Sequence, residues 1–376
     1  CIMYINALHL PKAMITIVGA GPAGSYLAYL LAKQGKKVTV LENHSIVGKP
    51  VQCTGIVTHS IEKFFKLKNE VIAKKLNKVV VVSKSKRIEV NVDEIVMWRD
   101  KFDQFLADMA QKEGAEIMLE HEFIGFNGSN SVKVKDRKND KIKNLKSEII
   151  VGADGPYSAV AKAAGMDSEP KNYIGIQAKV KVDMDTSSFE TYFGDDFPNF
   201  FGWCVPESDD TARLGIGCFE NAQHYFYKFL EKRTGKKDII CWESGLIPVY
   251  NPKKIIQKDN IYLIGDAATH VKATTGGVII PSLKAAQTLC DCIVNKKDYN
   301  KEFRRKSGRE LLLHLRIRKV LNKFSDKDYD SLLGLMNQEK IKKILKKYDR
   351  DTPIPLVTNL LLKEPRFLLF SKILFN

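Results

Sequence analysis

The chain has 376 residues, of which 44% are hydrophobic and 28% are charged, and its formal net charge is +16. A chain of this length can bury a large core and is expected to form two domains. The excess positive charge is interpreted first as a lysine-rich solvated surface. The alternatives are that it binds an anionic membrane, an anionic substrate or an acidic protein. Nucleic acid is not an expected partner, because no basic block is interleaved with aromatic residues.

The first predicted strand, at residues 15–18, follows Met14, a candidate native start, and leads into a GxGxxG turn. A helical pattern comes next, and a second strand at 37–41 ends in an acidic residue that can accept hydrogen bonds from a ribose. The glycines permit a tight turn and close approach of a pyrophosphate to the helix N-terminus. We therefore predict a dinucleotide site, either NAD or FAD, at Gly19, Gly21, Ala23, Gly24 and Glu42.

A glycine- and proline-containing loop, residues 43–58, leaves the second strand on the ligand side of such a sheet. Cys53 in this loop is either a small buried apolar residue or a ligand-facing thiol. A hairpin is predicted at 79–82 and 87–92, followed by an amphipathic helix that ends before Gly114. Arg99, just before that helix, is either a solvated charge or a cation that faces phosphate.

Two further buried strands end in turns that contain glycine and aspartate. Residues 148–152 precede Asp154, and residues 260–264 precede Gly265 and Asp266. Between these strands, residues 173–217 alternate apolar and polar side chains, as in an antiparallel sheet, which indicates a second domain. Its stretch from 197 to 206 is unusually aromatic and forms either core packing or a ligand-facing wall.

The remaining 301–376 region is rich in lysine and arginine and is predicted to be helical. Core helices are the first interpretation, and contact with a membrane surface is the alternative. Seven cysteines, widely scattered and without a CxxC pair, argue against a disulfide framework and against a zinc or iron–sulfur site, so no metal is expected. Residues 1–13 lack the apolar core of a signal peptide, and a cytoplasmic location is expected.

The three glycine turns, in this order and with an antiparallel insertion, resemble the FAD-binding fold of the aromatic hydroxylase type. Three features resemble the geranylgeranyl reductase family, which includes archaeal digeranylgeranylglycerophospholipid reductases. They are the loop at 49–55, the helix start at 99–103, and the sequence Gly-Asp-Ala-Ala at 265–268 followed by residues 276–279. The resemblance covers about residues 14–300.

This resemblance implies an α/β fold with a Rossmann-like FAD-binding domain, an inserted antiparallel substrate domain and a helical C-terminal region. The FAD-binding domain is expected at 14–170 and 255–300, with the hairpin near 79–97 joining the second domain. The substrate domain is expected at 171–254 and the helical region at 301–376.

The implied activity is flavin-dependent saturation of carbon–carbon double bonds in geranylgeranyl chains, most of all those of archaeal-type ether phospholipids. The alternative is an NAD(P)H-dependent FAD monooxygenase or a halogenase that acts on a small ring substrate. The implied partners are an isoprenoid lipid and an electron donor, which is ferredoxin, reduced deazaflavin or NAD(P)H. Such a protein is expected in the cytoplasm, with peripheral contact at the inner face of the cell membrane.

The family carries an aromatic signature, P-x-x-Y-x-W-x-F-P, along its isoprenoid cavity. Here the signature begins at Pro198 and has phenylalanine in place of tyrosine and Val205 in place of phenylalanine. The implied substrate contacts are Phe201, Trp203 and Pro206. Cys53 is the candidate proton donor, since a cysteine thiol is protonated at neutral pH. The implied cofactor contacts are Gly19, Gly21, Ala23, Gly24, Glu42, Cys53, Thr54, Ile56, Arg99, Phe123, Asp154, Gly265, Asp266, Gly276, Gly277, Val278 and Ile279.

Overall fold

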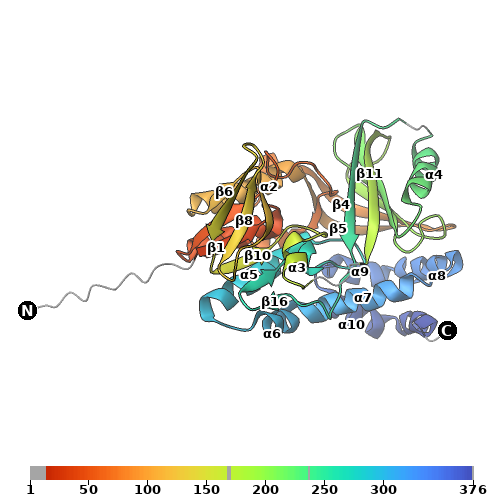
Figure 1. Cartoon of the computed structure of the whole chain (residues 1–376). Helices are drawn as coiled ribbons and strands as arrows, with labels where there is room; N and C mark the ends of the chain where they lie inside the picture. Colours follow the sequence, from red (N-terminus) through yellow and green to blue (C-terminus); the bar gives the residue numbers. More distant parts are fainter. Residues whose placement is uncertain (1–13, 167–170, 236–237, 375–376) are drawn as a thin grey trace, which may run out of the picture.

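Two large sheets and a layer of C-terminal helices make up the structure, a computed structural model that describes residues 14–166, 171–235 and 238–374 (Figure 1). The side chains of residues 372–374 are not described. Residues 1–13, interpreted above as an extension before the native start, lie outside the described residues.

The first sheet has six strands and is parallel except at one edge, where β16 and β17 run antiparallel. Its central strand, β1, pairs in parallel with β10 on one side and β2 on the other. β1 is a run of apolar and β-branched residues and is almost completely buried, as expected for a strand covered on both faces. In spatial order the strands are β16 (Gln257–Lys258), β17 (Ile261–Leu263), β10 (Ile149–Gly152), β1 (Met14–Val18), β2 (Lys37–Leu41) and β6 (Glu116–Met118).

The parallel arrangement determines where the three predicted turns lie. Strands β1, β10 and β17 are neighbours and point the same way, so their carboxyl ends meet at one edge of the sheet. The glycine turns follow these ends directly. Turns that are more than a hundred residues apart in the sequence are thereby brought together, as the order of the motifs predicts.

Helices cover the first sheet on one face, and a small antiparallel sheet packs on the same core. Helix α1 (Pro22–Lys33) contacts α2 (Arg99–Lys112) and α5 (Ile279–Asn295), and it buries Tyr26, Leu27 and Leu31. The three-stranded sheet consists of β7 (His121–Phe126), β8 (Ser131–Asp136) and β9 (Lys141–Lys146).

The second sheet has eight strands, and every neighbouring pair is antiparallel except β12 and β4. The predicted hairpin is longer than expected and belongs to this sheet as β4 and β5. The spatial order is β15 (Cys241–Pro248), β11 (Asn172–Lys181), β14 (Thr211–Cys218), β13 (Gly202–Pro206), β12 (Ser188–Tyr192), β4 (Ile72–Val82), β5 (Arg87–Met97) and β3 (Ile56–Thr58).

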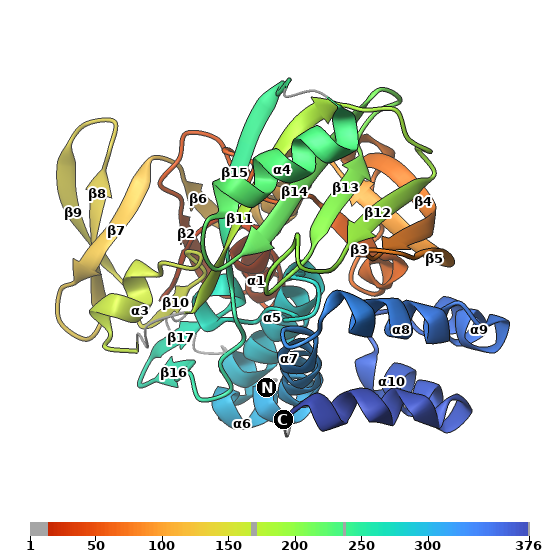
Figure 2. The same cartoon turned by 90° about the vertical axis from the view of Figure 1, so that its right-hand side faces the viewer.

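Helix α4 (Ala222–Thr234) covers one face of the second sheet and was not predicted above. It buries Phe226, Phe229 and Leu230, which follow helical spacing. The face of the sheet that α4 does not cover is turned toward the C-terminal helices (Figure 2). One face of the second sheet therefore packs against α4 in a hydrophobic core, and the other face is available to line a cavity.

The C-terminal region is helical, as predicted, and lies along the lower side of the molecule in Figure 2. Its largest fully buried side chain is Arg318 of α7. None of the described helices has the length and apolar content needed to cross a membrane. The elements are α6 (Tyr299–Phe303), the π-helical turn η4 (Arg304–Gly308), α7 (Arg309–Leu321), α8 (Asp326–Met336), α9 (Glu339–Lys347), α10 (Pro353–Lys363) and the 3₁₀ segment η5 (Pro365–Leu374).

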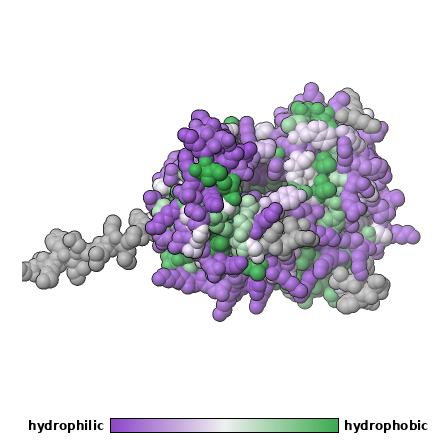
Figure 3. All heavy atoms as spheres, in the orientation of Figure 1, coloured by the Kyte–Doolittle hydropathy of each residue, from purple (hydrophilic) through white to green (hydrophobic). Residues whose placement is uncertain are grey.

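The α/β fold, the antiparallel sheet and the C-terminal helices expected from the sequence are all present. The face shown in the space-filling view is largely hydrophilic, and its hydrophobic residues lie in small separate groups (Figure 3).

Candidate active site

The first glycine turn leaves open space at the N-terminus of α1. Gly19 has φ +102°, and a Cβ at Gly19 or Gly24 would overlap a backbone carbonyl oxygen. A Cβ at Gly21, by contrast, would meet no heavy atom within 4 Å. No side chain caps α1, so its first backbone N–H groups remain available for a ligand. Gly19 and Gly24 thus serve the packing of the turn, whereas Gly21 keeps clear the space that a pyrophosphate would occupy.

Glu42 lies at the end of β2 and is bonded to this turn. Its Oε2 accepts a hydrogen bond of 2.9 Å from the backbone N–H of Ala20. Its Oε1 accepts one of 3.1 Å from the backbone N–H of His44 and lies 2.6 Å from His44 Nδ1. The carboxylate is therefore held in a fixed position beside the glycine turn, which is where the predicted ribose contact requires it.

The second turn packs directly on the first. The space that a Cβ on Gly19 would need is taken by the Ala153 carbonyl group, next to Asp154. Asp154 Oδ1 accepts a hydrogen bond of 2.6 Å from Ser158 Oγ, and its Oδ2 accepts one of 3.1 Å from the backbone N–H of Val160. These bonds fix the start of the short helix α3 (Ala159–Ala163). The recorded bonds of this carboxylate all lie within its own turn, and its contact with a cofactor stays a prediction.

The third turn presents a carboxylate with one buried oxygen that has no partner among the described residues. Gly265 has φ +65°, and a Cβ there would lie 3.0 Å from the Cβ of Ala23 in α1. Next to it, Asp266 Oδ1 is buried and accepts no hydrogen bond from the described residues. Burial raises the pKa of Asp266 to about 6, although the nearby charge of Arg99 opposes this shift. A buried oxygen without a donor is suited to a ligand hydroxyl group that donates to it.

Arg99 joins the Cys53 loop to helix α2. Its guanidinium donates to Asp103 at 2.9 Å and 3.0 Å from Nη2 and at 3.2 Å from Nε, and it lies close to Cys53. A Cβ at Gly55 would lie 2.6 Å from the carbonyl oxygen of Met97, so the loop runs close to the start of α2. Arg99 is thus not a solvated charge, because its guanidinium is largely buried and paired with Asp103. Its contact with phosphate stays a prediction.

The segment before α5 forms a tight loop at the boundary of a cavity. Gly276 N–H donates to the carbonyl oxygen of Lys272 at 2.8 Å, and Gly276 has φ +68°. A Cβ at Gly276 would lie 3.1 Å from the ring of Phe200 and 3.2 Å from Ile247. Helix α5 begins directly after this loop without a side-chain cap. Backbone N–H groups are therefore available at the boundary, which is suitable for a flat polar ring system.

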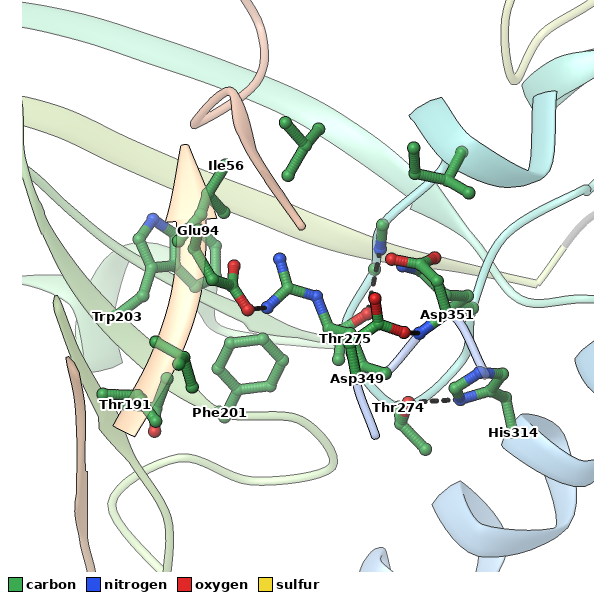
Figure 4. Close-up of a pocket in the computed structure, with 18 of the residues that line it drawn as sticks. Ile56, Glu94, Thr191, Phe201, Trp203, Thr274, Thr275, His314, Asp349 and Asp351 are labelled. Atoms are coloured by element: carbon green, nitrogen blue, oxygen red, sulfur yellow. Dashed lines mark hydrogen bonds and ion pairs between the residues drawn. The ribbon is translucent and has the colours of Figure 1, made fainter. Parts of the chain in front are cut away.

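The cavity has a volume of about 920 Å³ and extends from the third turn, at Asp266, to the C-terminal helices (Figure 4). Cys53, Thr54, Ile56, Asp266 and residues 276–279 line one end. One face is apolar and comes from the second sheet, with Phe201 and Trp203 among its residues. The rings of Phe201 and Trp203 meet edge to face with centroids 5.7 Å apart, and the Trp203 indole donates to Gln177 Oε1 at 3.1 Å. The predicted aromatic residues thus form a wall of this cavity, while contact with a substrate stays a prediction.

Pro206, a predicted substrate contact, and Phe123, a predicted cofactor contact, are outside the lining of this cavity. Pro206 does not line the cavity, although Val205 does. The reason is the two-residue period of a strand, since β13 turns Trp203 and Val205 to one face and the neighbouring residues to the other. Phe123 is in β7 and packs against Phe126 with ring centroids 5.2 Å apart. Its contact with the cofactor stays a prediction, because Gly21 and Glu42 lie outside the cavity lining as well.

A group of buried charged side chains lines the cavity and was not predicted from the sequence. Arg350, between α9 and α10, forms an ion pair with Glu94 of β5, and Lys272 forms one with Asp351. Thr58 Oγ1 donates to Asp351 at 2.8 Å. Burial raises the pKa of Asp351, but Lys272 and Arg350 outweigh it and lower the pKa to about 2. The charged triplet 349–351, which lies between the lysine-rich segment 339–347 and the apolar segment 353–362, was the only sequence signal for this group.

These residues fit FAD. The open turn at Gly21, the fixed Glu42 and the Asp266 turn follow neighbouring parallel strands of the first sheet, and the Asp266 turn and the loop at 276–279 line the same cavity. The sequence profile of the family described as FAD binding domain matches residues 12–239. FAD is accordingly the cofactor.

Two curated relatives align with most of the chain. A digeranylgeranylglycerophospholipid reductase from Methanococcus vannielii is 29% identical over 354 residues, which is 85% of this chain and 89% of that protein. One from Methanocaldococcus jannaschii is 28% identical over 393 aligned positions, which is 95% of this chain and 97% of that protein.

Solved structures share the fold. A geranylgeranyl bacteriochlorophyll reductase-like protein from Thermoplasma acidophilum superposes with a TM-score of 0.84 and 23% identity, covering 96% of this chain and 100% of that one. The flavin-dependent halogenase CmlS has a TM-score of 0.68 and 14% identity, covering 95% of this chain and 78% of that one.

The glycine turn gives a first prediction. Gly21→Val places a side chain in open space, so the apo protein should unfold within about 0.5 kcal/mol of the wild type, while FAD binding weakens at least about tenfold. Gly24→Val, the matched control, overlaps the Gly19 carbonyl and should lower the unfolding free energy by about 1–3 kcal/mol. Chemical unfolding and the ratio of flavin to protein absorbance measure both effects. Wild-type FAD affinity in Gly21→Val would contradict the assignment.

Asp266 gives a second prediction. Its folded pKa of about 6 lies above the ordinary value of 3.8, so the folded apo protein binds more protons between these values. Stability should therefore fall as pH rises through this window, by up to about 3 kcal/mol from this group. Urea unfolding of the apo protein at about pH 4 and pH 7 should show this fall reduced in Asp266→Asn and unchanged in the exposed control Asp108→Asn. An equal fall in both variants would exclude Asp266 as its source.

The Glu94–Arg350 ion pair gives a third prediction. Arg350→Met leaves a buried carboxylate unpaired and should cost about 3 kcal/mol of unfolding free energy. Adding Glu94→Gln should recover most of this loss, because the unpaired charge is then removed. A double-mutant cycle measured by chemical unfolding tests this coupling, and additive effects of the two substitutions would contradict it.

Proposed function

This chain belongs to the FAD-binding-domain family, and we propose that it is a flavin-dependent reductase that saturates carbon–carbon double bonds in geranylgeranyl chains. The observation that carries this proposal is the cavity of about 920 Å³, which joins the Asp266 turn and the loop at 276–279 to the aromatic wall. That volume lies near the upper end of the range for ligand pockets, about 300–1,000 Å³. The relatives named digeranylgeranylglycerophospholipid reductase support archaeal-type ether phospholipids as the source of these chains.

The apolar face of the cavity suits an isoprenoid chain. Val79, Val81, Phe189 and Phe193 extend the wall begun by Phe201 and Trp203. An isolated alkene offers no oxygen for an enzyme to polarise, so the protein must hold it in place and exclude water. Packed aromatic and β-branched side chains perform both tasks, and the ring faces favour any positive charge that develops on the alkene.

Saturation of an alkene adds one hydride and one proton. The hydride would be supplied by FAD in its reduced form. The proton must come from a group at the same end of the cavity, and Cys53 lines that end. The thiol also lies close to Arg99, at the start of α2. We therefore propose Cys53 as the proton donor.

The remaining partners follow from the same proposal. An electron donor must reduce the bound flavin, and ferredoxin, reduced deazaflavin and NAD(P)H all remain open. The net charge of +16 favours an acidic protein donor or an anionic lipid surface over a neutral partner. Because the proposed substrate is a membrane phospholipid, we propose a cytoplasmic protein that contacts the inner face of the membrane.

An anaerobic assay tests the function. The purified flavoprotein, reduced with dithionite, should convert a geranylgeranyl phospholipid to products heavier by two hydrogens for each bond, as measured by mass spectrometry. A saturated lipid is the matched control and should remain unchanged. Product formation that requires oxygen and NAD(P)H would favour a monooxygenase or halogenase instead, and bound flavin without any product would indicate a carrier.

Substitution of Cys53 tests the proton donor. Cys53→Ala should lower the rate of product formation by about 10²-fold or more, and Cys53→Ser should retain part of it. Bound FAD, measured by absorbance, should stay the same in both variants. Rates close to the wild type in both variants would remove Cys53 from this role.

A further inference from the structure

Helix α10 is apolar but poorly covered by the rest of the protein. Its sequence, Pro-Ile-Pro-Leu-Val-Thr-Asn-Leu-Leu-Leu-Lys, contains eight apolar residues in eleven, yet only Pro353 is buried. A helix of this composition ordinarily packs into a core. Here Ile354 is 44% exposed and Leu362 is 78% exposed.

The helix presents two apolar faces with different surroundings. Pro353, Leu356, Val357 and Leu360 follow helical spacing and line the cavity, as does Pro355 in the first turn. Ile354 and Leu362 are eight residues apart, lie on another side of the helix and face outward. One helix thus separates the isoprenoid-sized cavity from the exterior.

The outward apolar surface continues beyond α10. In η5, Leu368 is 53% exposed and Leu369 is 55% exposed. Four of the large hydrophobic residues that are exposed in the described structure therefore lie within sixteen residues of one another. Figure 2 shows α9 and α10 at the edge of the molecule, away from the small sheet of β7, β8 and β9.

Positive charge surrounds this surface. Residues 339–366 carry eight basic and four acidic side chains. Lys343, Lys346 and Lys347 of α9 are exposed, and no ion pair is recorded for them among the described residues. Lys346 and Lys347 also line the cavity, which places an opening of the cavity beside these lysines.

We propose that the α10 face docks on a lipid bilayer that carries anionic headgroups, and that the lipid chain enters the cavity between α9 and α10. The α10 face is defined as Ile354, Leu362, Leu368 and Leu369 together with Lys343, Lys346, Lys347 and Lys363. The inference rests on the proposed function, since it gives the membrane contact a location.

The chemistry of the surface selects this occupant. Leucines that project from the surface and are flanked by unpaired lysines match a bilayer, in which anionic headgroups lie next to apolar chains. A second copy of this basic chain would bring like charges together at the same surface. The adjoining cavity also needs an apolar route for its ligand, which an interface buried by protein would block.

Vesicle binding by the full flavoprotein tests the docking surface. Wild-type protein should bind vesicles of phosphatidylcholine with about one-third phosphatidylglycerol, and should bind pure phosphatidylcholine and high-salt samples at least about tenfold more weakly. Leu362→Glu/Leu369→Glu should reduce binding to the anionic vesicles by about tenfold or more. Ile142→Glu/Leu119→Glu introduces the same charges at exposed apolar positions near the small sheet and should bind like the wild type.

Activity measured in two formats separates this inference from the proposed function. With lipid dispersed in detergent, Leu362→Glu/Leu369→Glu should act within about twofold of the wild type, whereas with lipid embedded in vesicles its rate should fall in step with binding. Absence of product from the wild type in both formats would contradict the proposed function. The vesicle-binding measurement would still test the docking surface, because it does not depend on product formation. Wild-type vesicle binding by the double variant would overturn the docking surface. So would a wild-type dimer, seen by light scattering, that the variant converts to a monomer.

Discussion

The arrangement of the cavity depends on one buried cation. Arg318 of α7 is 1% exposed, and its guanidinium donates to the carbonyl oxygens of Ala273 at 3.0 Å, Thr274 at 2.6 Å and Phe200 at 3.3 Å. Burial lowers the pKa of Arg318, but an arginine stays protonated in proteins. An unpaired buried charge is costly, so these carbonyl groups must stay within reach. The loop before α5, the aromatic wall and the helical layer are thereby held in one relative position.

Two ion pairs from the C-terminal region also hold the loop before α5 and the second sheet. Lys272 is paired with Asp351, and the neighbouring Arg350 reaches Glu94 on the second sheet. The C-terminal helices are therefore a wall of the cavity. Buried ion pairs contribute little net stability compared with apolar packing of the same size. We infer that these ion pairs serve to fix relative positions. They hold three parts of the chain around the apolar cavity, while the glycine turns hold the cofactor at one end of that cavity.

The sequence was most informative where the chemistry is local. Gly19, Gly21 and Gly24, with the acid at Glu42, occur within one strand–helix–strand unit, and parallel neighbouring strands then bring Asp266 to the same edge. Prediction was less successful where the outcome depends on which way a strand faces, as at Pro206, or on pairs far apart in sequence. Arg318 and Phe200 are 118 residues apart, and Arg350 and Glu94 are 256 apart. No local sequence pattern encodes such partners. Helix α4 was not predicted, because the alternation of apolar and polar residues in the neighbouring strands favoured an antiparallel sheet throughout this region.

The central claim is that reduced flavin and an isoprenoid alkene meet in this cavity. The most direct measurement is rapid anaerobic mixing of the dithionite-reduced flavoprotein, freed of excess reductant, with a geranylgeranyl phospholipid, while the absorbance of oxidised flavin is followed. The account predicts that the oxidised-flavin band returns in proportion to the double bonds saturated, and that a fully saturated lipid has no effect. Flavin that stays reduced with the unsaturated lipid and reoxidises only when oxygen is admitted would contradict it.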